Sequence, residues 1–136
     1  MAGDPALIIL ALRTDKPQAE LYLYDDSKKL SQTKWQAHMK LAETLNSRIE
    51  KILNKSSISY EDLGGIAIFK GPGSFTGLRI GIAVANALAY GLSVPIVGNT
   101  GEDWLEKSIQ ALKDSQNNKI AIPEYGAPVH TTKPRK

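Results

Sequence analysis

The stretch that decides the fold lies at residues 70–81, Lys70-Gly71-Pro72-Gly73-Ser74-Phe75-Thr76-Gly77-Leu78-Arg79-Ile80-Gly81. The apolar run at residues 66–69 precedes it and the long apolar run at residues 78–90 follows it. The order predicts a strand, a glycine-rich loop and a helix. Glycines allow close approach, and a helix N-terminus offers free N–H groups, so a phosphate could bind here. The spacing fits neither the Walker nor the Rossmann pattern, and a tight strand-to-helix turn explains it equally well.

The segments on either side of this stretch complete an α/β pattern. Apolar or alternating runs predict a hairpin of two strands at residues 6–12 and 19–24, and a further strand at residues 94–97. Spacings of three and four predict a helix from about Thr33 to Leu53, and a second one is expected from Thr100, as its cap, to Leu112. We expect a last short strand at residues 119–122, and therefore a mixed sheet with flanking helices. Residues 1–122 would form one domain, followed by an extended basic tail at residues 123–136.

The helix after the glycine loop is apolar almost all round, with Arg79 and Asn86 as its only strongly polar residues. Small side chains form two stripes along it, one made of Gly81, Ala85 and Ala89, the other of Ala83, Ala87 and Gly91. Small stripes let another helix approach closely, and a helix without a polar side must be covered on every side. A chain of 136 residues has little with which to do this, so we expect a partner's pair of helices. The alternative is a fully internal core helix.

The composition and charge of the chain limit which classes of function are possible. The chain is 42% hydrophobic and 23% charged, as in ordinary globular domains, and it has no cysteine, which excludes a disulfide framework and fits the cytoplasm. Lys133, Arg135 and Lys136 supply much of the net charge of +3, so direct binding of nucleic acid has only a short basic tail to support it. The apolar run at residues 6–12 is too short to span a membrane, and no membrane contact is expected.

Together these residues resemble the TsaB family, also called YeaZ, whose hallmark is the stretch Gly-Pro-Gly-Ser-Phe-Thr-Gly-Leu-Arg-Ile-Gly after a short strand. The likeness extends to residues 63–68, to the pattern at residues 91–98, and to the first helix with His38 near its start. It implies an actin-like ATPase fold (ASKHA, ribonuclease H-like).

The resemblance also implies a function. Family members act as non-catalytic scaffold and activator subunits, and they form a heterodimer with the catalytic paralogue TsaD by packing the first two helices of each subunit. That complex engages the ATPase TsaE and modifies adenosine 37 of tRNA to threonylcarbamoyladenosine. We therefore expect no catalytic residue, no metal and no cofactor of its own, with ATP or ADP at the complex interface, tRNA contacted indirectly, and a homodimer as an option for the free chain. The expected interface residues are Ala42, Leu45, Ile49, Leu78, Ile82, Ala85, Asn86 and Ala89.

Two departures from the family pattern bear on function. Family members carry Asp-Thr-Ser after the first strand, whereas this chain has Arg13-Thr14-Asp15, which lacks the phosphate-loop carboxylate of the actin-like ATPases. The family's second domain is also almost absent, so the chain is interpreted as a shortened member. Nucleotide hydrolysis by this subunit is therefore not expected.

Two enzyme classes are the alternatives. A metal-dependent glycoprotease would need a ligand cluster, but the chain has only His38 and His130, no His-Glu-x-x-His pair and no cysteine. A nucleotide-binding enzyme would rest on residues 70–77, with Lys70, Ser74, Thr76 and Arg79 helping to hold nucleotide. We rank both below simple docking.

Overall fold

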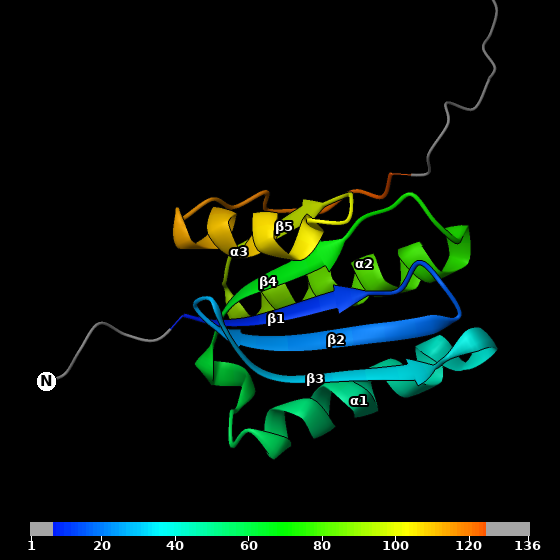
Figure 1. The fold of residues 1–136 in the computed structure, drawn as a ribbon, viewed down its shortest axis with the longest axis horizontal. Coiled ribbons are helices and arrows are strands. Elements are labelled where there is room, and N and C mark those ends of the chain that lie inside the picture. Colours follow the sequence, from blue (N-terminus) through cyan, green and yellow to red (C-terminus); the bar gives the residue numbers. More distant parts are fainter. Residues whose placement is uncertain (1–6, 125–136) are drawn as a thin grey trace, which may run out of the picture.

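The computed structural model describes residues 7–124, which form a five-stranded mixed sheet with helices on both faces (Figure 1). The sheet order is β3-β2-β1-β4-β5, with antiparallel pairing among β1, β2 and β3 and parallel pairing of β4 with both β1 and β5. The strands are β1 (Ile8–Arg13), β2 (Gln18–Asp25), β3 (Lys28–Gln36), β4 (Leu63–Phe69) and β5 (Ile96–Asn99). The helices are α1 (Leu41–Lys55), α2 (Phe75–Leu92) and α3 (Trp104–Lys113), with short 3-10 helices η1 (His38–Lys40) and η2 (Tyr60–Asp62).

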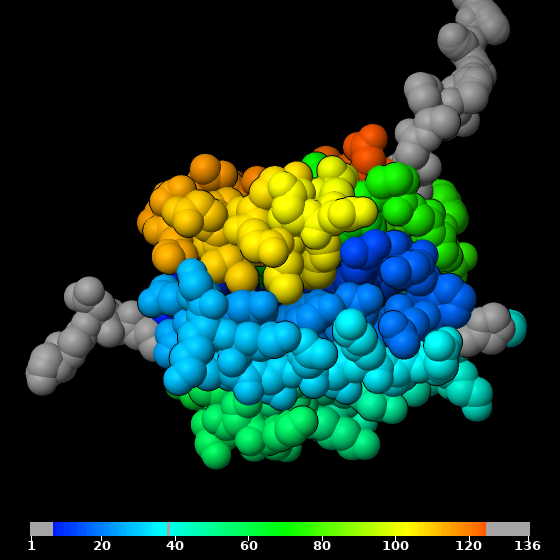
Figure 2. All heavy atoms as spheres, in the orientation of Figure 1, coloured from blue at the N-terminus to red at the C-terminus, as the bar shows by residue number. Residues whose placement is uncertain are grey.

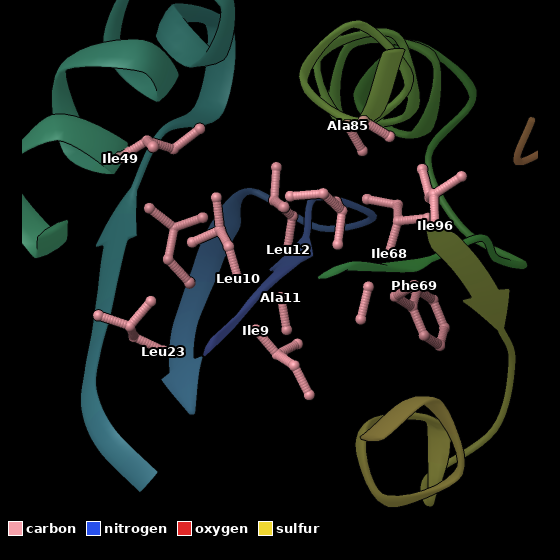
Figure 3. Packing of buried hydrophobic residues seen from close by; sticks show 14 of the residues in the cluster. Ile9, Leu10, Ala11, Leu12, Leu23, Ile49, Ile68, Phe69, Ala85 and Ile96 are labelled. Carbon is pink, nitrogen blue, oxygen red and sulfur yellow. The ribbon is translucent and has the colours of Figure 1, made fainter. Parts of the chain in front are cut away.

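The hydrophobic core has two layers because alternate residues of β1 point to opposite faces of the sheet. Leu10 and Leu12 point toward α1 and α2, whereas Ile9 and Ala11 point toward the side of α3 (Figure 3). All four side chains are fully buried. Such a continuous apolar run is expected for a central strand covered on both faces, and it makes β1 the axis of the domain.

Helix α2 packs against β4, β1 and β5 and also contacts α1. Ser74 caps its N-terminus by accepting a hydrogen bond from the N–H of Gly77, and Ser93, in the left-handed conformation, ends it. By length and composition α2 could also cross a membrane, a test that core helices of soluble proteins pass as well. Its contacts with the sheet account for its buried side.

Strand β3 contradicts the predicted start of the first helix. Residues 33–36 belong to this strand, which pairs with β2 along its whole length, and α1 begins only at Leu41. Trp35 is the buried residue of β3, and its indole N–H donates to Thr44 Oγ1 of α1 at 3.0 Å. Arg48 of α1 stacks over the same ring at 5.1 Å. The predicted helical stripe of Ala42, Leu45, Ile49 and Ile52 is confirmed at its last three residues, which are buried, whereas Ala42 is exposed.

The predicted last strand is also wrong. Residues 116–122 run along β5 without joining the sheet, and side-chain amides replace the backbone ladder. Asn117 and Asn118 accept hydrogen bonds from the backbone N–H groups of Ile96 and Gly98 at 3.0 and 2.9 Å. The backbone N–H of Asn118 in turn donates to the carbonyl of Ile96 at 2.7 Å. We call residues 116–124 the edge segment.

The second helix layer covers only part of its face of the sheet. Helix α3 packs on β4 and β5, and it begins at Trp104 rather than at the predicted cap Thr100. Figure 2 shows α3 over one half of this face, while the side chains of β2 and β3 form the surface of the other half. Residues 125–136, which include His130 and all but the first two residues of the predicted basic tail, lie outside the described residues.

Candidate functional site

The glycine loop presses against the turn between β1 and β2. A Cβ added at Gly73 would lie 2.3 Å from the Cβ of Asp15, and the Ser74 N–H donates to the Asp15 carbonyl at 2.9 Å. Gly71 has a φ of +119°, and a Cβ there would lie 2.0 Å from the carbonyl oxygen of Glu124. Real Cβ contacts are longer than 3.0 Å, so only glycine fits at both positions.

Two more glycines of the same stretch let α2 approach β1. A Cβ at Gly77 would lie 2.2 Å from the carbonyl oxygen of Thr14, and one at Gly81 would lie 2.1 Å from Thr14 Oγ1. The buried hydroxyl of Thr14 donates to the Gly77 carbonyl at 2.8 Å. The glycines are therefore explained by close backbone packing. This arrangement supports the interpretation as a tight strand-to-helix turn.

Arg13 stands where the family pattern has an aspartate, and it forms an ion pair with Asp15 of the same chain. Arg13 donates through Nε to Asp15 Oδ1 at 2.8 Å and through Nη2 to Asp15 Oδ2 at 3.2 Å. Its guanidinium also lies 3.9 Å from the ring centre of Phe69, at the end of β4. The hydrogen bond to Asp15 raises the pKa of Arg13 despite the opposing effect of burial. Asp15 is only 6% exposed, so its charge is neutralised within the fold.

A second buried carboxylate near this ion pair also has a partner. The hydroxyl of Tyr22 donates to Glu20 Oε1 at 2.5 Å, and Glu20 is buried. Burial raises the pKa of Tyr22, and the hydrogen bond to Glu20 raises it further. The Tyr22 and Phe69 rings each meet Trp104 of α3 edge to face, at 6.2 and 5.8 Å. These contacts hold α3 against the sheet.

Most of the predicted interface residues face the core of this chain, which contradicts their placement on a contact surface. The side of α2 that carries the first small stripe lies against the sheet, so a partner cannot reach it (Figure 3). The buried residues of the predicted set are Leu45, Ile49, Leu78, Ile82, Ala85 and Ala89. Ala42 is exposed, and Asn86 is half-buried.

The second small stripe lies on the opposite side of α2 and is exposed. We define the outer side of α2 as Phe75, Arg79, Ala83, Ala87 and Tyr90, all of them exposed. Phe75 is 55% exposed and Tyr90 is 90% exposed, and Arg79 stacks over Phe75 at 5.3 Å. The expectation that the described chain leaves one side of this helix uncovered is confirmed. Within residues 7–124, the alternative of a wholly internal helix is wrong.

A groove adjoins this outer side. It has a volume of about 510 Å³ and lies between the β1–β2 turn, the segment that enters α1 and the first turns of α2. We call it the α1–α2 groove, and its lining is Thr14, Lys16, Pro17, Ala37, Met39, Leu41, Ala42, Ser74, Thr76, Gly77 and Ile80. A shallower hollow, lined by Thr76, Arg79, Ile80 and Ala83, shares two of these residues. The groove and the outer side of α2 thus form one continuous surface.

The remaining predicted loop residues lie at the rim of this surface. Pro72, Ser74 and Thr76 are exposed at the start of α2, and Lys70 is half-buried. His38 begins η1, and its side chain lies outside the described part of the structure. Within residues 7–124, no three His, Cys, Asp or Glu side chains gather as a metal ion would require.

Asn86 has a structural role that its sequence position did not reveal. Its side chain accepts from the Ala121 N–H at 2.8 Å and donates to the Ala121 carbonyl at 3.1 Å, which fastens the edge segment to α2. Ala121 is only 4% exposed. The pairing spans 35 residues, and no local pattern signals it.

Asn86→Ala is expected to lower the free energy of unfolding by about 1–3 kcal/mol, because two backbone groups of the buried Ala121 lose their partner. The free energy of unfolding of Asn86→Asp should lie between those of Asn86→Ala and the original chain, since a carboxylate still accepts from the Ala121 N–H. Urea unfolding measures the first effect, and faster hydrogen exchange at residues 119–122 would localise it. Asn54→Ala, an exposed change on α1, is the control. An Asn86→Ala variant as stable as this control would contradict the role.

Comparison with known proteins finds similarity to two kinds of threonylcarbamoyladenosine protein, TsaD and TsaB. The model of the family "TsaD: tRNA N6-adenosine threonylcarbamoyltransferase" matches residues 35–116. The threonylcarbamoyltransferase of Geotalea daltonii is 44% identical over 62 residues, which are 46% of this chain and 18% of that protein. The threonylcarbamoyladenosine biosynthesis protein TsaB of Escherichia coli is 46% identical over 50 residues, 37% of this chain and 22% of that one.

A solved structure shows the same architecture. YeaZ from Pseudomonas aeruginosa superposes with a TM-score of 0.67 at 25% sequence identity, covering 80% of this chain. The match covers 50% of the YeaZ chain, so this chain spans about half of that relative and a smaller share of the curated ones. The likeness confirms the predicted α/β fold of the actin-like ATPase type.

Proposed function

Because the chain belongs to the TsaB (YeaZ) family, related to the TsaD threonylcarbamoyltransferases, we propose that it is a scaffold subunit for threonylcarbamoyladenosine synthesis on tRNA. In this role it forms a heterodimer with a TsaD-type protein and performs no chemistry itself. The observation that carries the proposal is the uncovered outer side of α2, next to the α1–α2 groove.

The composition of this surface supports docking. Ala83 and Ala87 leave the backbone of α2 accessible to a second helix, while Phe75 and Tyr90 place aromatic rings at its two ends. Arg79 is its single charged residue. A patch with aromatic anchors and few charges is typical of the centre of a protein interface.

The arrangement at the end of β1 supports the absence of catalysis. Asp15 is the carboxylate closest in sequence to the end of β1, and Arg13 holds both of its oxygens. The glycine loop, which could have received a phosphate, is in contact with Asp15 and Thr14 instead. A general base or a metal ligand needs an accessible oxygen, and this carboxylate offers none.

Ala83→Arg is expected to weaken the complex with a TsaD-type protein about 100-fold or more. The added side chain would be forced into a close helix contact, and an unpaired charge buried there costs about 3–5 kcal/mol. The measurement is co-purification of both proteins from one expression host, followed by titration. The cognate TsaD-type protein from the same genome is the partner to use.

Gln110→Arg on α3 is the matched control. It adds the same exposed arginine on the opposite face of the sheet, where Asp114 lies one turn away and can pair with it. Its complex should remain within about threefold of the original. Equal affinities for the two variants would contradict docking through α2, and ATP turnover by the isolated chain would contradict a scaffold role. The contact with TsaE, nucleotide at the interface, self-association and cytoplasmic location stay predictions from the family.

A further inference from the structure

The α1–α2 groove is a hollow beside the outer side of α2, and docking of a helix on that side would not by itself require it. Among its lining residues, Ala37 is 3% exposed and Leu41 is 5% exposed, so their surfaces form its floor. Met39, 86% exposed, stands at its edge. A volume of about 510 Å³ falls in the range of about 300–1,000 Å³ that is typical of pockets for small ligands. The groove therefore has room for a large side chain, and its floor and edge are apolar.

The rim of the groove is positively charged. Lys16 lines the groove, Lys40 lies between the lining residues Met39 and Leu41, and Arg79 lines the adjoining hollow. None of the three forms an ion pair with a described carboxylate, because the ion pairs of residues 7–124 are Arg13–Asp15 and Lys107–Asp103. Two acidic residues lie near this rim in sequence: Asp15, next to Lys16, is paired with Arg13, and Glu43 lies in the first turn of α1.

The helix ends add to this charge. The groove contains residues from the first turns of both α1 and α2, and the N-terminus of a helix carries a partial positive charge. Both helices begin at the same end of the sheet, next to the turn between β1 and β2 (Figure 1). The first turn of α2 contains no acidic residue to offset its dipole. An apolar hollow inside a positive rim favours an apolar group flanked by carboxylates.

We propose that the α1–α2 groove binds one large apolar side chain from a helix of the TsaD-type subunit, and that acidic residues within one turn of it pair with Lys16, Lys40 and Arg79. This rests on the proposed docking through α2 and adds which feature of the partner is recognised. The adjoining hollow shares Thr76 and Ile80 with the groove, so the bound side chain would lie at the N-terminal end of the contact along α2. The apolar side chain supplies affinity, and the charges set orientation and association rate.

The first test fills the groove and reverses its rim. Ala42→Trp, at an exposed position of the lining, is expected to weaken the complex at least tenfold, whereas Asn54→Trp further along α1 should leave it unchanged. Exchanging Lys16, Lys40 and Arg79 for Glu should slow association about 100-fold at low salt and remove its decrease with ionic strength. The same exchange at the exposed residues Lys28, Lys34 and Lys51 changes net charge equally and should alter association less than fivefold. Thermal unfolding checks that every variant is folded.

The second test identifies the occupant directly. Because the chain has no cysteine, Ala42→Cys offers a single site for a maleimide-linked photo-cross-linker, with Asn54→Cys as the matched control. Mass spectrometry of the cross-linked complex should find a large apolar residue of the partner within one helical turn of Asp or Glu. A complex that forms but is insensitive to Ala42→Trp, or whose cross-links map to a basic or polar segment, would overturn the inference and leave docking intact. Failure of the original chain to bind a TsaD-type protein would overturn both.

Discussion

Gly77→Ala is expected to destabilise the protein by about 2 kcal/mol or more, although the same change inside most helices stabilises by about 0.5–1 kcal/mol. The sign reverses because the new methyl group would lie 2.2 Å from the carbonyl oxygen of Thr14. This oxygen belongs to the backbone of the β1–β2 turn, so a rotamer change cannot relieve the clash. Instead α2 must move away from β1, which would also stretch the Thr14–Gly77 hydrogen bond. Urea unfolding followed by circular dichroism measures the loss.

Gly91→Ala provides the control within the same helix. Nothing lies within 4 Å of a Cβ at that position, so the ordinary helix preference for alanine should prevail. We expect a gain of up to about 1 kcal/mol. If the two substitutions changed stability by the same amount, the glycine loop would not be explained by packing against the β1–β2 turn.

Ala85→Arg is expected to prevent folding, with a loss of about 4 kcal/mol or more. Ala85 is fully buried and points at the sheet, so the guanidinium would enter an apolar layer next to β1 and β4 without a partner (Figure 3). Ala87→Arg, two residues further along at an exposed position, should change stability by no more than about 0.5 kcal/mol. Solubility, circular dichroism and thermal unfolding of the isolated chain distinguish them.

This pair of variants separates folding from docking. Loss of a complex with Ala85→Arg would reflect an unfolded subunit, whereas loss with Ala83→Arg in a folded chain would reflect the surface. A soluble, cooperatively unfolding Ala85→Arg protein would mean that α2 is turned differently on the sheet from the orientation described above.

The glycine stretch allowed the fold class and family to be predicted, but it could not say how α2 is rotated. Both stripes of the helix consist of small side chains, so hydrophobicity does not distinguish the side that faces the sheet. The rotation follows from Thr14, whose hydroxyl and carbonyl require Gly81 and Gly77 on the sheet side. That contact joins residues 63 positions apart, and a single sequence does not reveal it.

Strand β3 escaped prediction because it is polar and lies at the edge of the sheet. Burial alternates along residues 31–36, but two of the inward positions are the polar residues Ser31 and Thr33 and only Trp35 is apolar, so the sequence lacks the apolar–polar alternation that marks a half-buried strand. Its residues 33–36 were assigned to the following helix for the same reason. In the edge segment the error was the reverse, because a strand was predicted where none exists. Its apolar residues Ile120 and Ile122 suggested a buried strand, yet both are exposed.

The sequence predicted that one side of α2 is uncovered, but it did not predict which side or the groove beside it. An uncovered side of α2 follows from its composition, whereas the α1–α2 groove depends on three segments that meet only in the fold. The ion pair of Arg13 with Asp15 is likewise a tertiary outcome. The sequence showed that a family carboxylate was missing, but not that the nearest one had been neutralised.

Both borders of the described sheet are protected against pairing with a further strand. On the outer border, β3 presents the exposed lysines Lys28, Lys29 and Lys34, and on the other the amides of Asn117 and Asn118 occupy N–H groups of β5. Lysines and occupied donors both discourage an incoming strand from extending a sheet. Growth of fibres by strand addition is thus disfavoured at both borders of the described sheet, which agrees with the proposed docking through a helix.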